Sequence, residues 1–144
     1  MNKQIFVNLP VTDLDKSKAF FQALGYAFNA QFTNESGACL VINEGSIHAM
    51  LLTRDFFKTF IDKPLAQAKE ATGVLICLSC ESREEVDGIV AKALAAGGRA
   101  PREPQDHGFM YSHAFEDLDG HVWEFVWMAP QAPEALEPTV AVGR

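Results

Sequence analysis

Residues 117–128 read Asp-Leu-Asp-Gly-His-Val-Trp-Glu-Phe-Val-Trp-Met, and this stretch predicts a turn that leads into a strand. Short carboxylates bond to their own backbone in turns, and Gly120 can adopt a positive φ because it has no Cβ. The β-branched and aromatic run that follows favours a strand, whose side chains alternate between two faces. Both faces are apolar except at Glu124. We therefore expect both to be covered, and Glu124 then needs a cation, a metal ion, hydrogen-bond donors or a proton.

The length and composition of the chain predict one soluble globular domain. A chain of 144 residues buries roughly 70% of its unfolded surface, and 48% hydrophobic with 22% charged residues is ordinary for this class. The net charge is −7 without a basic block, so we expect no nucleic-acid partner. No apolar run approaches the ~20 residues of a membrane span, and the start lacks a signal-peptide pattern. Three cysteines cannot all pair within one chain, which favours reduced thiols and a cytoplasmic location.

The first half of the chain, about residues 4–62, predicts a strand, a helix and three further strands. Thr12 or Asp13 can cap the start of the helix, and Gly25 can end it in a left-handed conformation. A short amphipathic helix is expected at residues 54–61. The expected strands cover residues 5–11, 26–33, 38–42 and 47–52.

The second half, about residues 72–128, repeats this plan after a connector at 65–71. Ser82 and Glu85 have the spacing of a capping box, and two glycines at 97–98 stop the helix that follows. The expected strands cover residues 73–80, 99–102, 109–116 and 122–128. Because a repeated unit of this size cannot bury its own apolar face, we expect the halves to pack together. Residues 129–144 form a tail rich in proline, alanine and glutamate, which predicts a surface or mobile extension.

Two β-α-β-β-β units that end in the hairpin quoted above resemble the vicinal oxygen chelate superfamily. This superfamily includes glyoxalase I, fosfomycin and bleomycin resistance proteins and extradiol dioxygenases. The resemblance covers residues from about 4 to 128, and the opening stretch at residues 8–17 is also similar. It implies a single α+β domain at residues 1–128, in which two modules form a curled mixed sheet around a cavity. It also implies a homodimer.

Metal-using members of this superfamily carry histidine or glutamate ligands on four strands. By the resemblance, these positions are Phe6, a residue near Leu51 (Met50 or Leu52 if the alignment is shifted by one), a residue near Leu75, and Glu124. Only Glu124 matches. A divalent metal needs three or four nitrogen or oxygen ligands, so we expect no metal site and no cofactor. This departure argues against glyoxalase, fosfomycin-transferase and dioxygenase chemistry, although His48, His113 and Glu124 together would make a non-standard site.

Four residues are candidates for substrate binding: Asn8, Tyr111, His113 and Glu124. Glu124 could instead be satisfied by a neighbouring Asn, Tyr or Arg, and Asn8 by a neighbouring strand or by Glu124. A lone histidine is more often structural than a ligand, and His121, next to the turn glycine, is expected to be exposed. The aromatic residues Phe56, Phe57, Phe60 and Trp127 are expected in the core or in a dimer interface.

The two cysteines of Cys77-Leu78-Ser79-Cys80 have the spacing of a redox or zinc motif. Residues three apart on a strand face opposite sides, so the thiols should diverge. We interpret both residues as small buried hydrophobes.

Three functions fit these observations. The first is a metal-free small-molecule binder with an apolar, aromatic-lined cavity near Glu124. The second is an enzyme in which Glu124 is a catalytic base, or a metal-dependent lyase or dioxygenase that uses Glu124 with non-standard ligands. The third is a non-catalytic interaction protein that docks through its acidic tail, residues 131–144.

Overall fold

The computed structural model describes residues 2–130 and folds as two modules that each carry a four-stranded mixed sheet. In the first module the sheet order is β1-β4-β3-β2, with β1 parallel to β4. Its elements are β1 (Ile5–Val11), α1 (Leu14–Ala23), β2 (Ala27–Asn29), a 3-10 turn η1 (Ala30–Phe32), β3 (Gly37–Asn43), β4 (Ile47–Thr53) and α2 (Arg54–Lys58). This arrangement confirms the expected α+β class.

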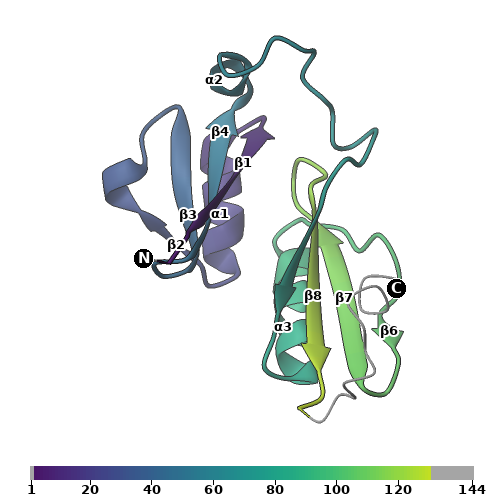
Figure 1. Cartoon of the computed structure of the whole chain (residues 1–144). Helices are drawn as coiled ribbons and strands as arrows, with labels where there is room; N and C mark the ends of the chain where they lie inside the picture. The colour runs from purple at the N-terminus through teal and green to yellow at the C-terminus, as the bar shows by residue number, and fades with distance from the viewer. Residues whose placement is uncertain (1, 131–144) are drawn as a thin grey trace.

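The second module repeats the topology, with the sheet order β5-β8-β7-β6 and β5 parallel to β8. Its elements are β5 (Leu75–Ser79), α3 (Arg83–Ala95), β6 (Gln105–Asp106), β7 (Met110–Glu116) and β8 (Val122–Met128). Figure 1 shows the modules side by side, joined by a chain segment that runs from α2 across to β5. We call this segment, residues 59–74, the connector. The expected tail at residues 131–144 lies outside the described residues.

Local sequence signals set the helix boundaries. The Asp13 side chain caps α1 by accepting a bond from the Lys16 N–H, and the chain turns at Gly25 with a φ of 101°. Ser82 caps α3 in the same way by accepting from the Glu85 N–H. The Glu85 carboxylate reaches back to the N–H of Glu81, one residue before the cap. These contacts satisfy donors that the first helical turn leaves free.

Two of the expected strands are wrong in extent. The strand expected at residues 26–33 stops at Asn29, because the Asn29 side chain accepts from the Gln31 N–H and turns the backbone into η1. Residues 99–102 form no strand beyond a single bridge from Arg99 to Glu116. This segment and the next residues contain Pro101 and Pro104, which have no N–H to donate to a ladder.

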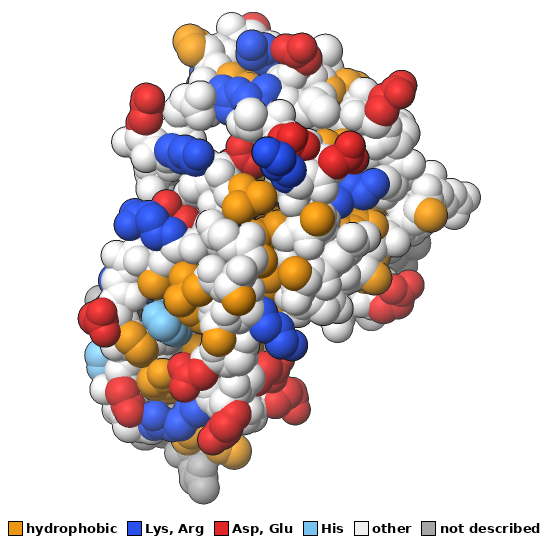
Figure 2. Space-filling view, turned by 180° about the vertical axis from the view of Figure 1, so that it is seen from behind, with side chains coloured by type: hydrophobic (Ala, Val, Ile, Leu, Met, Phe, Trp, Pro, Cys, Tyr) orange, Lys and Arg blue, Asp and Glu red, His pale blue; other side chains and the backbone are white. Residues whose placement is uncertain are grey.

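A shared core joins the two modules. Helices α1 and α3 each cover one face of their own sheet and also contact each other. Aromatic rings from both modules meet edge to face: the ring centroids of Phe21 and Trp123 lie 5.2 Å apart, and those of Phe20 and Phe115 lie 5.7 Å apart. On the side of the molecule opposite to the view in Figure 1, a central band of hydrophobic side chains is surrounded by charged ones (Figure 2).

The hairpin between β7 and β8 ties the second module to the first. The Asp119 carboxylate accepts a bond of 2.9 Å from the Thr12 N–H, at the junction of β1 and α1. The His121 ring nitrogen Nε2 lies 2.8 Å from the Pro10 carbonyl oxygen. The expectation that His121 is exposed is therefore wrong, since this contact holds its ring half-buried between the modules. No helix among the described residues is long and apolar enough to cross a membrane.

Candidate ligand-binding site

Each sheet has one face away from its helix, which we call the open face. Strand register places Phe6, Asn8 and Pro10 of β1 on the open face of the first module, beside His48, Met50 and Leu52 of β4. The opposite face of β4 carries Ala49 and Leu51, which are fully buried. On the second module, the open face includes Cys77 of β5, Ser112 and Ala114 of β7, and Val122, Glu124 and Val126 of β8.

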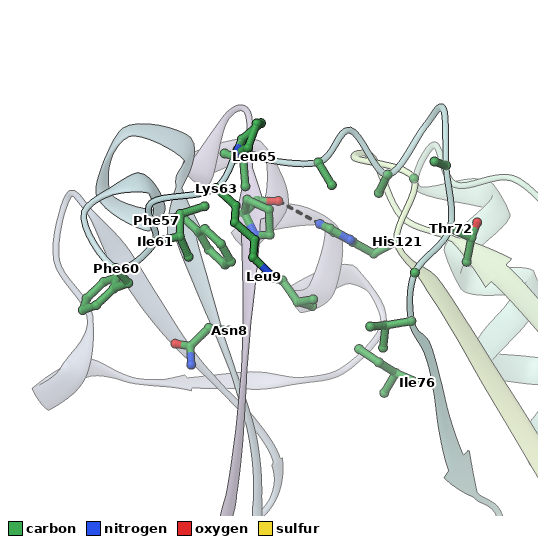
Figure 3. Close-up of a pocket in the computed structure, with 18 of the residues that line it drawn as sticks. Asn8, Leu9, Phe57, Phe60, Ile61, Lys63, Leu65, Thr72, Ile76 and His121 are labelled. Atoms are coloured by element: carbon green, nitrogen blue, oxygen red, sulfur yellow. Dashed lines mark hydrogen bonds between the residues drawn. The ribbon is translucent and has the colours of Figure 1, made fainter.

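A cavity of about 820 Å³ lies where the connector passes over the end of β1, the start of β5 and the β7–β8 hairpin. Figure 3 shows Asn8 and Leu9 on the β1 side, Ile76 and His121 on the side of the second module, and Lys63 and Leu65 of the connector. Most of the lining side chains are apolar, among them Phe57, Phe60, Ile61, Leu65, Val74 and Ile76. The polar lining groups include Asn8, Lys63, His121 and the two threonines Thr59 and Thr72.

Of the predicted binding residues, Asn8 lines this cavity and Glu124 does not. The cavity reaches Val122, which precedes Glu124 by two residues on the same strand face. The side chain of Glu124 is 2% exposed, and its Oε2 accepts a bond of 3.0 Å from Nη2 of Arg102. Arg102 therefore occupies the position next to the carboxylate, and the cavity lies further along the sheet, toward the connector.

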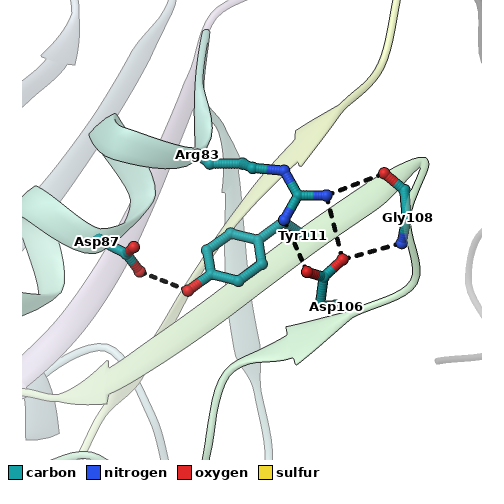
Figure 4. A network of polar contacts seen from close by, with 5 residues as sticks. All are labelled: Arg83, Asp87, Asp106, Gly108 and Tyr111. Atoms are coloured by element: carbon teal, nitrogen blue, oxygen red, sulfur yellow. Dashed lines mark hydrogen bonds and ion pairs between the residues drawn. The ribbon is translucent and has the colours of Figure 1, made fainter.

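Tyr111 and His113 lie on the opposite face of the sheet from Glu124, so within residues 2–130 these side chains do not line one cavity with it. Their partners on β8 are Trp127 and Phe125, which point toward α3. The Tyr111 hydroxyl donates a bond of 2.6 Å to Asp87 of α3 (Figure 4). This bond is the main reason that the pKa of Tyr111 is raised to about 12.

The face of Tyr111 is further covered by Arg83. Its guanidinium group lies 5.1 Å from the centroid of the Tyr111 ring and 5.0 Å from that of Trp127, a cation–π geometry. The same group forms an ion pair of 2.8 Å with Asp106 and donates to the carbonyl of Gly108 (Figure 4). These contacts make the Tyr111 side of β7 a packing surface between strand and helix.

The residues around Glu124 do not fit a metal site. Its register neighbours are Cys77 on β5 and Ala114 on β7, and a guanidinium group already supplies the positive charge. Among residues 2–130, no three His, Cys, Asp or Glu side chains gather in a way that could hold a metal ion. His48 lies on the open face of the other module, with its ring stacked on Phe6 at 4.5 Å between centroids.

Register places the positions that the resemblance gave. Leu51 faces the core, whereas the alternatives Met50 and Leu52 lie on the open face, as does His48 opposite Phe6. The β5 residue opposite Glu124 is Cys77. Cys77 is exposed, so its interpretation as a buried hydrophobe is wrong; it faces the open side of the sheet.

Similarity to known proteins is strongest at the level of the fold. A family model described as bleomycin resistance protein-like N-terminal matches residues 3–43. The solved structure of hypothetical protein SA1046 from S. aureus is 32% identical at a TM-score of 0.73, over 88% of this chain and 95% of that chain. No curated protein matches the chain.

Two further solved structures share the fold at lower identity. A glyoxalase/bleomycin resistance protein/dioxygenase family enzyme from Burkholderia phytofirmans PsJN is 17% identical at a TM-score of 0.71, over 88% of this chain and 99% of that chain. TnmS3, an antibiotic binding protein from Streptomyces sp. CB03234, is 17% identical at a TM-score of 0.61, over 90% of this chain and 98% of that chain.

Proposed function

Because the chain belongs to the vicinal oxygen chelate superfamily, of the glyoxalase, bleomycin resistance protein and dioxygenase type, we propose that it is a small-molecule-binding member whose ligand occupies the cavity beneath the connector. The cavity itself carries this proposal. Its volume of about 820 Å³ and its apolar lining with a few polar groups are those of a site for a drug-sized molecule. The antibiotic-binding protein TnmS3, which has the same fold, supports this class of function.

The side chains that line the cavity indicate the chemistry of its ligand. Phe57, Phe60 and Ile61 offer aromatic and aliphatic surface, which favours a flat apolar ligand body. Asn8 can donate and accept hydrogen bonds, and the Lys63 ammonium group can donate to an acceptor, while the neighbouring Asp62 carboxylate can accept. We therefore expect a mainly apolar ligand with one polar group.

We propose that binding requires no metal. The cation beside Glu124 is the guanidinium group of Arg102, and the neighbouring side chains Cys77 and Ala114 do not complete a metal-ligand set within the described residues. The alternative, a metal-dependent lyase or dioxygenase that uses Glu124 with non-standard ligands, lacks a ligand cluster in residues 2–130.

We further propose that the protein is a homodimer that covers the open faces. Phe6 of β1 and Leu75 of β5 are large apolar side chains on the open faces that the single chain leaves exposed. The buried centre of homodimer interfaces is enriched in apolar surface. Light scattering coupled to gel filtration tests this: a mass of one chain at every concentration would contradict the dimer.

A fluorescence titration with anilinonaphthalene sulfonate tests the cavity, because this probe combines aromatic rings with an anionic group. Phe60 lines the cavity and is 65% exposed, whereas Phe32 is 61% exposed and lies elsewhere, so Phe32→Ser is a matched control for Phe60→Ser. Losing one aromatic contact of about 1–2 kcal/mol predicts a dissociation constant roughly 5- to 30-fold weaker for Phe60→Ser only. Equal affinities in the two variants, or binding that a chelator abolishes, would refute the proposal.

A further inference from the structure

A second cavity, of about 770 Å³, lies between the modules on the side of the sheets that the helices cover. It is bounded by the end of α1 and the turn to β2, the β3–β4 hairpin, the end of β5 and one face of α3. Its apolar lining consists of Leu24, Ile42, Ile47, Leu78, Ile89 and Phe125. We call this cavity the α3 groove.

One residue of α3, Gly88, keeps the groove open. The face of α3 that lines the groove carries Glu85, Gly88, Ile89 and Lys92, which recur at helical spacing. Gly88 lies inside the helix, its φ is not positive, and a Cβ built on it would have nothing within 4 Å. Neither backbone conformation nor a close neighbour therefore requires a glycine here, although glycine weakens a helix interior relative to alanine. Any larger side chain at this position would instead take up the volume of the groove.

The charge of the groove is negative at the end where α3 begins. Glu81, Glu84 and Glu85 line this end, whereas Lys92 lies two helical turns beyond Glu85, about 10 Å along the helix axis. The N-terminus of α3 contributes about half a positive charge, which the three carboxylates exceed. This end of the groove therefore favours a cation.

Tyr26 adds an uncharged acceptor and an aromatic ring to the same end. Its ring packs against that of Phe21, with 6.3 Å between the centroids. Burial, and then the neighbouring Cys80 and Glu85, raise the pKa of Tyr26 to about 12. The pKa of the Cys80 thiol is raised to about 11, by burial first and then by Glu85. Both groups therefore stay neutral at pH 7, and the negative charge resides on the carboxylates.

We propose that the α3 groove binds an organic ammonium ion, that is, an apolar body with one protonated amine. The ammonium group lies between the Glu84 and Glu85 carboxylates and Tyr26, whose oxygen atoms accept its N–H bonds and whose ring contacts the cation. The apolar body lies along the aliphatic lining, which includes Ile42 and Leu78. An anion is repelled by the carboxylates, and a neutral ligand gains nothing from them.

The α3 groove is separate from the ligand site of the proposed function. None of its lining residues lines the cavity beneath the connector, and its strand residues lie on the faces opposite to the open faces, apart from those at strand ends. The inference therefore stands independently of the proposed function.

An NMR titration with phenethylammonium tests the inference, with 2-phenylethanol and 3-phenylpropionate as neutral and anionic probes of similar shape. The backbone amide signal of Gly88 reports on the α3 groove, and that of Gly73 reports on the cavity beneath the connector. We expect phenethylammonium to shift the Gly88 signal saturably and to leave the Gly73 signal unchanged. Its dissociation constant should be about 3- to 10-fold lower than that of 2-phenylethanol, and 3-phenylpropionate should bind more weakly than both.

Two variants test the shape and the charge of the groove, each with a matched control. Gly88→Leu fills the groove with a good helix former, so the fold should persist while phenethylammonium binding weakens by more than about 10-fold. Ala91→Leu makes a similar change at an exposed position of α3 outside the groove and should leave binding unchanged. Glu85→Gln removes one charge but keeps an oxygen that can accept from the Glu81 N–H, and should weaken binding about 2- to 5-fold. Glu103→Gln changes the net charge equally outside the groove and should have no effect.

Four results would overturn the inference. The first is the lack of a saturable shift at Gly88, and the second is equal binding of 3-phenylpropionate. The third is equal weakening by Glu85→Gln and Glu103→Gln, which would show attraction to the net charge alone. The fourth is a loss of mass in light scattering for Gly88→Leu with probe binding unchanged, which would show that a second copy of the chain occupies the groove.

Discussion

Gly120 in the β7–β8 hairpin is a position where one added methyl group should strongly lower the free energy of unfolding. Its φ is +88°, a conformation that L-residues with a Cβ rarely adopt. A Cβ built there would lie 2.8 Å from the backbone nitrogen of Lys69 and 2.9 Å from its Cα. Both atoms belong to the connector backbone, which cannot move aside as a flexible side chain can. Gly120→Ala must therefore strain the turn and displace the connector.

The loss of unfolding free energy in Gly120→Ala is the sum of two effects. Forcing an alanine into a left-handed conformation costs about 1–2 kcal/mol. Overpacking against a fixed backbone costs about 1–3 kcal/mol more. Gly45→Ala is the matched control, because Gly45 has a φ of +77° but nothing within 4 Å of an added Cβ. Only the first effect applies to Gly45, so Gly120→Ala should be less stable than Gly45→Ala by roughly 1–3 kcal/mol.

Urea denaturation of the unmodified protein, Gly120→Ala and Gly45→Ala measures this difference in the free energy of unfolding directly. At about 2–4 °C per kcal/mol for a chain of this size, thermal unfolding should show Gly120→Ala melting roughly 2–12 °C below Gly45→Ala. Since the connector forms one wall of the cavity, anilinonaphthalene sulfonate should also bind more weakly to Gly120→Ala than to Gly45→Ala. Equal free energies of unfolding in the two variants would refute the close approach of connector and hairpin.

Two further predictions concern ionisation and the core. The sequence has two tyrosines, and both have a raised pKa. Burial raises the pKa of Tyr26 to about 12, and the hydrogen bond to Asp87 raises the pKa of Tyr111 to about 12. An ultraviolet titration should therefore show no phenolate at pH 10. Because both pKa values are raised in the folded state, the two protonated hydroxyls contribute to the free energy of unfolding below pH 10.0, and this contribution is lost as the pH rises through about 12. A step in phenolate absorbance near pH 10 in the folded protein would contradict the prediction. Phe21→Ala should lower the free energy of unfolding by about 3–5 kcal/mol in urea denaturation, because Phe21 is 1% exposed and contacts Trp123 of the other module. A loss below about 1 kcal/mol would count against this packing between the modules.

The order of elements could be predicted because each boundary has a local physical cause. Asp13 and Ser82 cap the helices that follow them, and Gly25 adopts the positive φ that ends the first helix. The strand expected at residues 99–102 is interrupted by Pro101, which has no N–H to donate to a ladder. Only Arg99 meets a partner, Glu116.

The grouping of candidate binding residues failed for a different reason, which the sequence contains. The turn at residues 117–121 fixes the register of β7 against β8, so that Glu116 pairs with Val122 and Ala114 with Glu124. Side chains on a strand alternate, so Tyr111 and His113 must lie on the face opposite to Glu124. Hairpin register, applied to both strands, would have separated these residues without a structure. Arg102 could not be found this way, because it reaches Glu124 from a loop with no regular pairing.

The closing hairpin is the part of the sequence that most resembles the superfamily, and its contacts give it a structural role. Asp119 bonds to the Thr12 N–H and His121 to the Pro10 carbonyl, so the motif joins the second module to the first at the β1–α1 junction. These bonds specify how two modules pack, and they involve neither the side chain of Phe6 nor that of Glu124. The contacts of this motif with the first module therefore do not depend on these two open-face side chains. The hairpin therefore carries the resemblance to the superfamily, whereas the ligand chemistry of the protein must be argued from the lining of the cavity, which includes Asn8 and Lys63.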